Sequence, residues 1–479
     1  GDVSFRYGTT EHGGGTDYQG KFGYAAPFAQ GRGNYMIGAS AYTRDPIYLR
    51  QREISKSADK TRYARDPFNA AGGSQDDRTP IGIWPRFTTA TSTTNRWLYP
   101  INGVPTLTTV TIPRAQYADD NPYIIGQPQS TRYSLNTRVE YELRPRLRFF
   151  GEFTGYFSTS MTQRQPITLS ESDRVVTLSA NNPYNPFGSR FYSPTGAPNT
   201  DGTPRLTGTP QATTLVSVLL KDLGGESVEV NSGVYRGVAG LRGKILNDWT
   251  WESAAVYTRA YTGDVSNNAA RESLFQKALM RTDNTAFNPF GYTFKVAGNA
   301  IVPDQPYTNP QSVLDTFVQK WRHDGFSAIT SYDARASGPI FRYWGNTVSL
   351  ATGAEYRHEQ YLDLRPAYVG SNPPGVGLAE NDNDYLVASY APNSTGNRIV
   401  YSGYVETIIP VFSPQRKIPL LYSLELTGSA RYENYSDFGT TTRPKAGLNW
   451  KPYDGLMVRA SFNEGFSAPN LPTLYAPTR

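Results

Sequence analysis

Cysteine is absent from this chain, and histidine and methionine are scarce. The sequence has no cysteine, three histidines and four methionines among 479 residues. Without cysteine there is no disulfide framework, no thiol nucleophile and no zinc–thiolate site. The histidines, His12, His323 and His358, lie far apart in sequence and give little support for a metal site or a catalytic triad.

Long apolar runs and a strong charge bias are lacking too. One of the most apolar stretches, residues 215–220, is far shorter than the roughly 20 residues that a membrane-spanning helix needs. It predicts a strand or a packing segment within a loop. The net charge of +6 comes without a basic block, so nucleic-acid binding has little support. The first residues already alternate like a strand, unlike a signal peptide.

Catalytic motifs are missing as well. The sequence has no HExxH, GxSxG or Walker loop. The glycine pair Gly375-Val376-Gly377 lacks the third glycine and the preceding strand of a dinucleotide-binding turn. We therefore expect a protein that is not an enzyme and that uses no cofactor.

What the sequence does contain is alternation of apolar and polar residues. Along residues 424–432, Leu424, Leu426 and Tyr432 share one face of a strand, whereas Glu425 and Arg431 share the other. In a soluble protein such an apolar face covers a core. Repetition along the whole chain favours a different interpretation.

We predict about thirteen strands of roughly nine to fifteen residues, which are long enough to cross a bilayer when tilted. Their centres lie within residues 3–7, 17–24, 34–43, 132–143, 147–153, 235–245, 249–257, 327–337, 347–361, 398–409, 424–432, 445–450 and 456–462.

The predicted connections alternate between short and long. Short links fall near residues 27–33, 144–146, 246–248, 338–346, 410–419 and 451–455. Long polar links fall near 44–130, 158–231, 262–322 and 362–397. Outer-membrane barrels place short turns on the periplasmic side and long loops outside the cell. The sequence therefore predicts an all-β, antiparallel transmembrane β-barrel that occupies residues 1–479 as one incomplete domain.

Tryptophan placement agrees with this interpretation. Trp249, Trp251, Trp344 and Trp450 lie at or near short turns, as expected for an interfacial aromatic girdle. The alternative is that they are ordinary aromatic residues at strand ends.

The later part of the chain resembles the TonB-dependent outer-membrane receptors. The resemblance rests on YENYSDFG at 432–439, RPKAGLNWKP at 443–452, GAEYR at 353–357 and EGFSAPNL at 464–471. The last motif is similar to the family's EGFRAP-x-L signature, with Ser467 in place of the usual arginine. Short echoes, NPYNPFG at 182–188 and AFNPFG at 286–291, are similar to loop elements of large receptors in this family.

The resemblance implies a barrel of about 22 strands around a plug. On this expectation the chain is a fragment that lacks the plug, its TonB box and the final strands. It also implies location in the outer membrane, surrounding lipid as a partner, and ligand uptake driven by the TonB complex of the inner membrane. A ferric siderophore, a cobalamin-like cofactor and an oligosaccharide all remain open as cargo.

Charged residues at strand positions are predicted to face the lumen, because they are costly against lipid. Most of them would form hydrogen-bond ladders, and a minority would touch substrate. The set is Arg138, Glu140, Glu142, Arg242, Glu252, Glu355, Arg357, Glu425 and Arg431.

Loop aromatics and arginine are the candidates for ligand capture. Aromatic rings stack on flat ligand faces, and arginine pairs with carboxylates. We predict substrate binding by Trp97, Tyr99, Tyr184, Phe187, Arg190, Tyr192, Phe287 and Phe290. The alternative for each is packing of the loops. The acidic stretch 380–384 has hard oxygen ligands suited to Ca²⁺, but a solvated loop tip is the simpler interpretation, and we predict no metal site.

The function predicted from the sequence is active import across the outer membrane of a bulky, scarce nutrient. A passive porin-like channel and a secreted β-rich adhesin or carbohydrate-binding protein are the alternatives.

Overall fold

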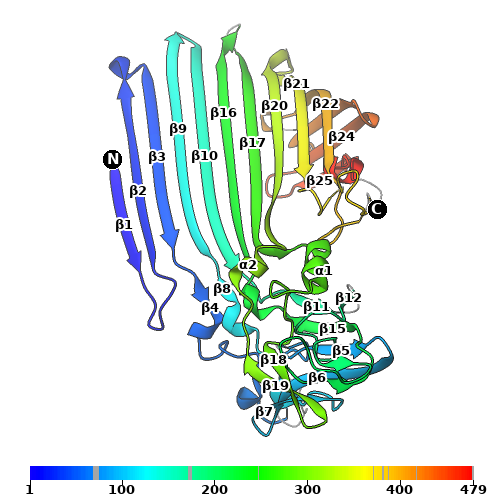
Figure 1. Cartoon of the computed structure of the whole chain (residues 1–479). Helices are drawn as coiled ribbons and strands as arrows, with labels where there is room; N and C mark the ends of the chain where they lie inside the picture. Colours follow the sequence, from blue (N-terminus) through cyan, green and yellow to red (C-terminus); the bar gives the residue numbers. More distant parts are fainter. Residues whose placement is uncertain are drawn as a thin grey trace.

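One antiparallel sheet of thirteen strands organises the computed structural model, as Figure 1 shows. The structure describes residues 1–479 except 68–74, 83, 171–174, 246–247, 371, 380–381, 387, 417 and 477–479. Each sheet strand pairs with the next one along the chain: β1 (Asp2–Gly8), β2 (Asp17–Phe28), β3 (Gly33–Arg44), β9 (Gln129–Arg144), β10 (Leu147–Gln163), β16 (Ser227–Ile245), β17 (Trp249–Ala270), β20 (Val318–Tyr343), β21 (Asn346–Leu364), β22 (Ser394–Phe412), β23 (Ser423–Tyr435), β24 (Gly439–Lys451) and β25 (Val458–Asn463).

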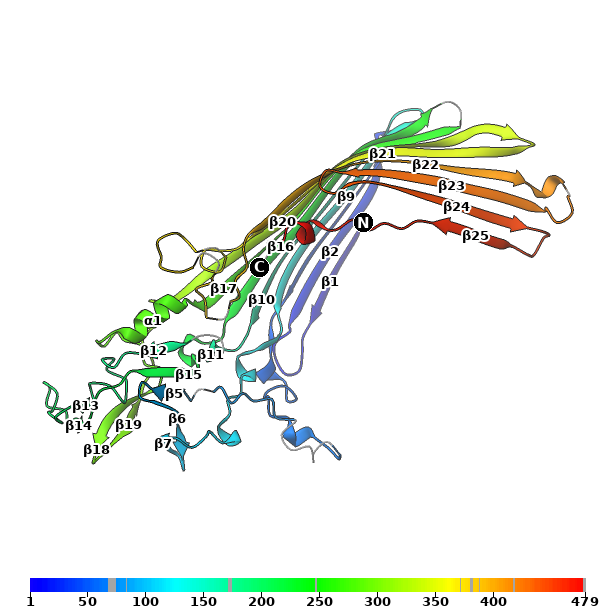
Figure 2. The same cartoon turned by 90° about the vertical axis from the view of Figure 1, so that its right-hand side faces the viewer.

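The sheet is an open, curved wall in this structure (Figures 1 and 2). Within the described residues, β1 pairs only with β2 and β25 pairs only with β24. Short turns join the strands at one end, and the four long segments lie at the other end together with the short β1–β2 and β23–β24 links. The predicted strand number is confirmed. No helix in the described part of the chain is long and apolar enough to cross a membrane.

Strand register gives the sheet two chemically different faces. Across neighbouring strands, Glu142 lies opposite Arg148, Arg148 opposite Arg242, and Arg242 opposite Glu252. Alternation then places every charged residue predicted to face the lumen on this same face. That part of the sequence-based prediction is confirmed.

The opposite, outer face is aromatic and apolar. Tyr235 contacts Tyr257, and Tyr356 contacts Tyr332 and Tyr401, with ring centroids 5.3–6.2 Å apart. Tyr332 and Tyr401 are more than half exposed. Such a face is unsuited to water and suited to lipid.

A second aromatic band lies at the short-turn end. Trp344 stacks on Tyr343, and Trp249 donates its indole N–H to the carbonyl oxygen of Pro339 at 2.9 Å. Gly338 makes room for the Trp249 ring, because a Cβ there would lie 2.5 Å from Trp249 Cγ. We call the outer-face row of Tyr235, Tyr257, Tyr332, Tyr356 and Tyr401 the tyrosine band. Among the described strand residues, charged outer-face residues such as Arg259 and Asp324 lie beyond this band, toward the long segments. The two bands therefore delimit an apolar belt.

The central strands are longer than the sequence suggests. β20 has 26 residues and β17 has 22, whereas roughly nine to fifteen were expected. Beyond the tyrosine band both faces carry polar residues, so alternation of hydrophobicity no longer marks the strand there. Backbone pairing nevertheless continues to Val318.

The four long connections, 45–128, 164–226, 271–317 and 365–393, are not irregular loops throughout, which corrects the sequence-based description. They contain β4 (Ile47–Tyr48), β5 (Arg86–Thr89), β6 (Ser92–Ile101), β7 (Val104–Thr108), β8 (Ile125–Gln127), β11 (Thr168–Ser170), β12 (Val176–Leu178), β13 (Tyr192–Ser193), β14 (Leu206–Thr207), β15 (Thr213–Leu219), β18 (Tyr292–Ala297), β19 (Ala300–Pro306), α1 (Glu272–Met280) and α2 (Gln311–Leu314). The remaining helix, α3 (Leu471–Leu474), follows β25. Short 3-10 turns occur at 29–31, 49–51, 61–63, 114–116, 121–123, 221–223 and 414–416.

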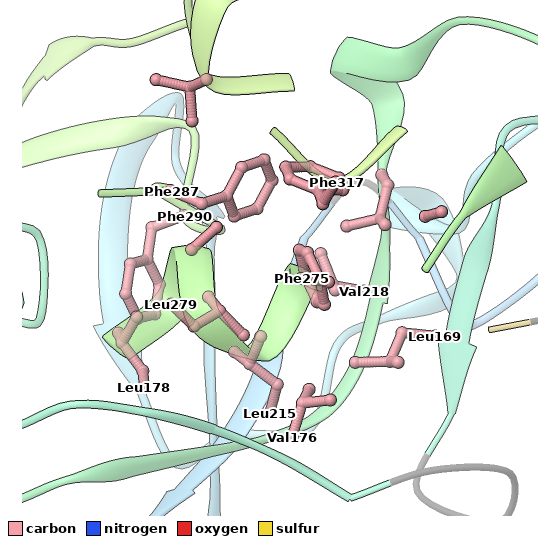
Figure 3. Close-up of a cluster of buried hydrophobic side chains, with 14 of the residues drawn as sticks. Leu169, Val176, Leu178, Leu215, Val218, Phe275, Leu279, Phe287, Phe290 and Phe317 are labelled. Carbon is pink, nitrogen blue, oxygen red and sulfur yellow. The ribbon is translucent and has the colours of Figure 1, made fainter. Parts of the chain in front are cut away.

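We call the packed part of these four connections the loop domain. Its largest sheet runs β11-β15-β5-β6-β7, with β12 also on β15. Its core takes Phe87 from the first connection, Leu215 from the second, Phe290 from the third and Leu386 from the fourth. Figure 3 shows this cluster around α1. This core could not be predicted from the sequence, because each connection supplies only some of its residues.

The NPYNPFG and AFNPFG echoes build this core. The side-chain oxygen of Asn185 accepts the N–H of Phe187, and that of Asn288 accepts the N–H of Phe290, both at 2.9 Å. Each turn therefore directs a phenylalanine inward. The Asn182 amide donates to the carbonyl oxygens of Leu279 and Phe287, which ties the two echoes together.

Phe290→Ala tests this core. Phe290 is 1% exposed and packs edge-on against Phe87 and Phe294 at 5.2 and 5.4 Å. The cavity left by alanine should destabilise the loop domain by about 3–5 kcal/mol. Protease added to intact cells should cut the loop domain faster, while the barrel keeps its heat-dependent gel mobility. Val110→Ala, at an exposed site, is the control; equal cleavage of both variants would contradict the assignment.

Candidate functional site

A cavity of about 430 Å³ opens where the charged face of the long strands meets the loop domain. We call it the vestibule. Strand residues Val228, Asp264 and Trp321 line one side, and residues 164–168, Arg365, Val369, Tyr385, Ala388, Ser389 and Ala391 of the connections line the other. Its size is within the range of ligand pockets.

An aromatic pair forms one wall of the vestibule. The rings of Trp321 and Tyr385 lie 6.4 Å apart, over a small cluster that includes Ala269 and Val369. Tyr385 is 3% exposed, and burial raises the pKa of its phenol. Its hydroxyl therefore stays neutral, and its ring packs behind Trp321, whose partly exposed indole offers a flat surface for stacking.

The facing wall is cationic. Arg164 is exposed, and Arg365 donates to Asp363 Oδ2 at 2.9 Å. The Nε of Arg365 is buried and has no hydrogen-bond partner among the described residues. Burial raises the pKa of the Glu226 carboxyl, which the charge of Arg164 partly opposes. Glu226, beside Arg164, therefore loses its charge more readily than an ordinary glutamate does.

His323 fixes the floor of the vestibule. Its Nδ1 lies 2.8 Å from Asp264 Oδ1, and its Nε2 contacts Asp363 Oδ1. These contacts join β17, β20 and β21 side by side. Because the two carboxylates lie on opposite edges of one ring, they cannot share an ion with it. Within the described residues, no cluster of three or more His, Asp or Glu side chains is arranged to hold a metal ion.

A buried ion pair holds the fourth connection against the vestibule. Arg271 and Asp384 lie 2.7 Å apart, with side chains 11% and 1% exposed. Asp384 also accepts from the N–H and hydroxyl of Ser273 at 2.8 and 2.7 Å, at the start of α1. A carboxylate is favoured there, since helix N-termini carry unsatisfied N–H groups. The Arg271 guanidinium lies 3.4 Å above the Tyr368 ring.

This use of Asp384 bears on the acidic stretch 380–384. The Asp384 carboxylate is engaged by Arg271 and Ser273, and Asn383 accepts the N–H of Tyr385. Glu380 and Asn381 lie outside the described residues. The stretch therefore anchors the vestibule wall.

Most residues predicted to capture ligand lie within the loop domain, away from the vestibule lining. Phe287 and Phe290 are buried in its core, and Phe187 and Tyr192 pack against that core. Trp97 and Tyr99 form a second buried cluster with Ile112. As placed, these six side chains pack the connections, and their role in binding stays a prediction.

The other two predicted residues are more accessible. Tyr184 shares a 2.8 Å hydrogen bond with the Tyr307 hydroxyl, and burial raises its pKa. Arg190 pairs with Asp201 at 2.7 Å, and the hydrogen bonds from Thr203 and Arg190 lower the pKa of that carboxyl. Neither residue lines the vestibule.

The sequence reading missed Trp321, His323, Arg365 and Tyr385. One signal was available: Trp321 and His323 are two residues apart, so they share a strand face, and Trp321 lies far from any short turn. The contact between Trp321 and Tyr385 could not be predicted, because Tyr385 lies 64 residues later in the sequence, in a connection whose fold brings it there.

The chain was compared with protein-family models, curated proteins and solved structures. A family model described as TonB dependent receptor-like, beta-barrel, matches residues 179–478. No curated protein sequence matches the chain.

Solved structures match over 98% of the chain. The ferric enterobactin receptor from Pseudomonas aeruginosa shares 11% identity with a TM-score of 0.41, and the siderophore receptor PirA from Acinetobacter baumannii shares 9% with a TM-score of 0.43. The chain spans only 44% and 43% of the length of these proteins.

Asp384→Asn tests the anchoring of the vestibule. Removing one charge of a buried pair leaves Arg271 uncompensated, at a cost of about 3–5 kcal/mol. Protease should therefore cut the 365–393 connection faster in outer-membrane vesicles. Asp201→Asn removes an exposed acid of a similar pair and should change little. Cleavage that is unchanged by Asp384→Asn would show that the pair does not hold this connection.

Proposed function

The chain belongs to the family of TonB-dependent receptor β-barrels, whose model matches residues 179–478, and from this premise we propose that it is the barrel wall of an outer-membrane importer. The predicted fold class, an antiparallel β-barrel, is confirmed by this match and by the thirteen-stranded sheet. In the proposal, ligand binds from outside the cell, and the TonB complex of the inner membrane supplies the energy for its passage.

The observation that carries the proposal is the division of one sheet into two faces. The outer face presents aromatic side chains between two bands, and the other face presents paired charges and a cavity at its outer end. Only an environment that is apolar on one side and aqueous on the other suits both faces.

The vestibule supports a ligand that has flat rings and anionic groups. Trp321, backed by Tyr385, provides a stacking surface, and Arg164 and Arg365 provide positive charge. A neutral oligosaccharide would use the aromatic wall alone, whereas an anionic ligand could also meet Arg164 and Arg365. We therefore favour an anionic, ring-bearing nutrient.

Catalysis has no part in this proposal. The vestibule combines aromatic, cationic and hydrogen-bonded acidic groups, which suits reversible binding. Stacking and charge pairing of this kind are weak enough individually to permit release.

Uptake by cells that express the full gene product tests the proposal. Radiolabelled ferric catecholate, ferric citrate, cobalamin and a malto-oligosaccharide form a suitable panel. For the ligand that enters, Arg365→Gln should raise the half-saturation concentration at least about tenfold, because a charged hydrogen bond is lost. Arg322→Gln, on the outer face beside Asp324, should leave it unchanged.

Deletion of TonB should abolish the uptake. Passage that continues without TonB would contradict active import and favour a passive channel. Equal effects of Arg365→Gln and Arg322→Gln would remove the vestibule from the ligand path.

Glu226 predicts the pH dependence of binding. Because burial raises its pKa, this carboxyl takes up a proton at a pH where an ordinary glutamate is still charged. As pH falls through that pKa, the vestibule loses a negative charge, and an anionic ligand should bind a few-fold more tightly. Glu226→Gln should remove this rise. Binding measured against pH in both proteins checks it, and an unchanged slope in the variant would contradict the assignment.

A further inference from the structure

A separate cavity of about 340 Å³ lies between the first and second long connections. Trp84 and residues 115–119 and 122–123 of the first connection line it, together with Leu219 at the end of β15. It shares no lining residue with the vestibule. Its volume is large enough for a small ligand. We call it the aromatic pocket.

Backbone hydrogen bonds hold the walls of the aromatic pocket together. The N–H of Leu219 donates to the carbonyl oxygen of Gly82 at 3.1 Å, which sets the second connection beside the chain that leads into Trp84. Ala118 and Thr79 exchange two backbone hydrogen bonds, at 2.9 and 3.0 Å. The pocket is therefore built by contacts between segments that lie far apart in sequence.

Three aromatic side chains, those of Trp84, Tyr117 and Tyr123, line this pocket, and each is partly exposed. Trp84 and Tyr117 also pack against the buried cluster that contains Trp97, so their rings are supported from behind. The faces of aromatic rings carry partial negative charge and attract cations. Three such side chains around one small cavity favour a ligand with positive charge.

A carboxylate lines the same pocket. Asp119 accepts the backbone N–H groups of Ala58 and Asn121 on its Oδ1 atom, at 3.0 and 3.2 Å. Within the residues that the structure describes, its Oδ2 atom has no hydrogen-bond partner and the side chain has no ion pair. Burial and, to a smaller extent, the charge of Asp119 raise the pKa of the neighbouring Asp120. Asp119 is therefore the acid that can meet a ligand in the pocket.

Nearby arginines have other partners. The Nε atoms of Arg78 and Arg114 bind Asp76 at 2.9 and 2.8 Å. Arg50 donates to the carbonyl oxygen of Pro122 at 2.8 Å, and its guanidinium lies 3.9 Å from the centre of the Tyr48 ring. None of the three lines the aromatic pocket. The charge of Asp119 is therefore not matched by a cation of the pocket itself.

These features separate the possible classes of ligand. An anion would be repelled by Asp119, and a purely apolar molecule would cover its carboxylate without offering a partner. A neutral sugar could accept or donate hydrogen bonds but would not use the attraction of the ring faces for positive charge. A cation meets both the carboxylate and the rings.

We propose that the aromatic pocket binds a small organic cation with a methylated ammonium group. Its methyl groups would lie against Trp84, Tyr117 and Tyr123, and its charge would lie near Asp119. This inference goes beyond the proposed import function, because the ligand has the opposite charge to the one favoured for the vestibule. The two sites therefore select different compounds.

The test uses the purified full gene product in a polyoxyethylene detergent, whose headgroup is neither a cation nor a sugar. Calorimetry measures the binding of choline, of its uncharged carbon analogue dimethylbutanol, and of methyl glucoside. Asp119→Asn removes the charge but keeps an oxygen that can accept from Ala58 and Asn121. Trp84→Leu removes a ring but keeps an apolar side chain. Asp201→Asn removes an acid elsewhere in the connections and is the matched control.

Choline should bind the wild type at least about tenfold more tightly than dimethylbutanol does. Asp119→Asn and Trp84→Leu should each weaken choline binding at least about tenfold, whereas Asp201→Asn should leave it unchanged. Cleavage of the loop domain by protease at the wild-type rate shows that each variant keeps its fold.

Equal binding of choline and dimethylbutanol would overturn the proposal, as would choline binding that is the same in all four proteins. Absence of choline binding to the wild type would overturn it too. Tighter binding of methyl glucoside, lost in Trp84→Leu, would instead assign the pocket to a neutral sugar. No step of this test depends on TonB or on the vestibule, so its result is independent of the import proposal.

Discussion

The structure depends on the requirement that every backbone N–H and C=O in an apolar environment be hydrogen-bonded. A continuous antiparallel ladder meets this requirement, and its two-residue period separates side chains into two faces. Everything else follows from that separation. Tyr332 and Tyr356 can face lipid only because Asp333 and Glu355, their neighbours in sequence, face the other way. The same register that pairs the backbone also brings Arg335 to Glu252.

Strand length beyond the apolar belt is what places the vestibule on the barrel wall. The ladder of β17 and β20 continues past the tyrosine band, so Asp264, Trp321 and His323 lie outside the belt but on the inner face. The loop domain then closes over them. Its core is shared among four connections, and Arg271 and Asp384 join two of them directly. Phe275, Phe287 and Phe317 pack edge-on against one another in the core that holds these connections together.

Much of the barrel wall could be predicted from residue order alone. Alternation at positions such as Leu424, Glu425 and Leu426 fixes faces, and it does so without knowledge of any distant contact. The loop domain could not be found this way. Its strands β11, β12 and β15 have three to seven residues, too few to show a period, and Phe87 meets Phe290 across 203 positions. The vestibule could not be found from the sequence for the same reason. Aromatic residues in the NPF echoes look exposed in a polar sequence, but Asn185 and Asn288 turn them inward.

The two-faced wall can be measured directly, because these 479 residues contain no cysteine and any cysteine elsewhere in the full gene product can be replaced first. Spin labels at single cysteines placed in turn at residues 253–258 of β17, in the full gene product within lipid vesicles, report contact with oxygen and with a water-soluble nickel complex. The account predicts that labels at 253, 255 and 257 meet oxygen most, as lipid-facing sites do. Labels at 254, 256 and 258 should instead be shielded from lipid. Accessibility without a two-residue period, or with the faces reversed, would contradict the barrel wall described here.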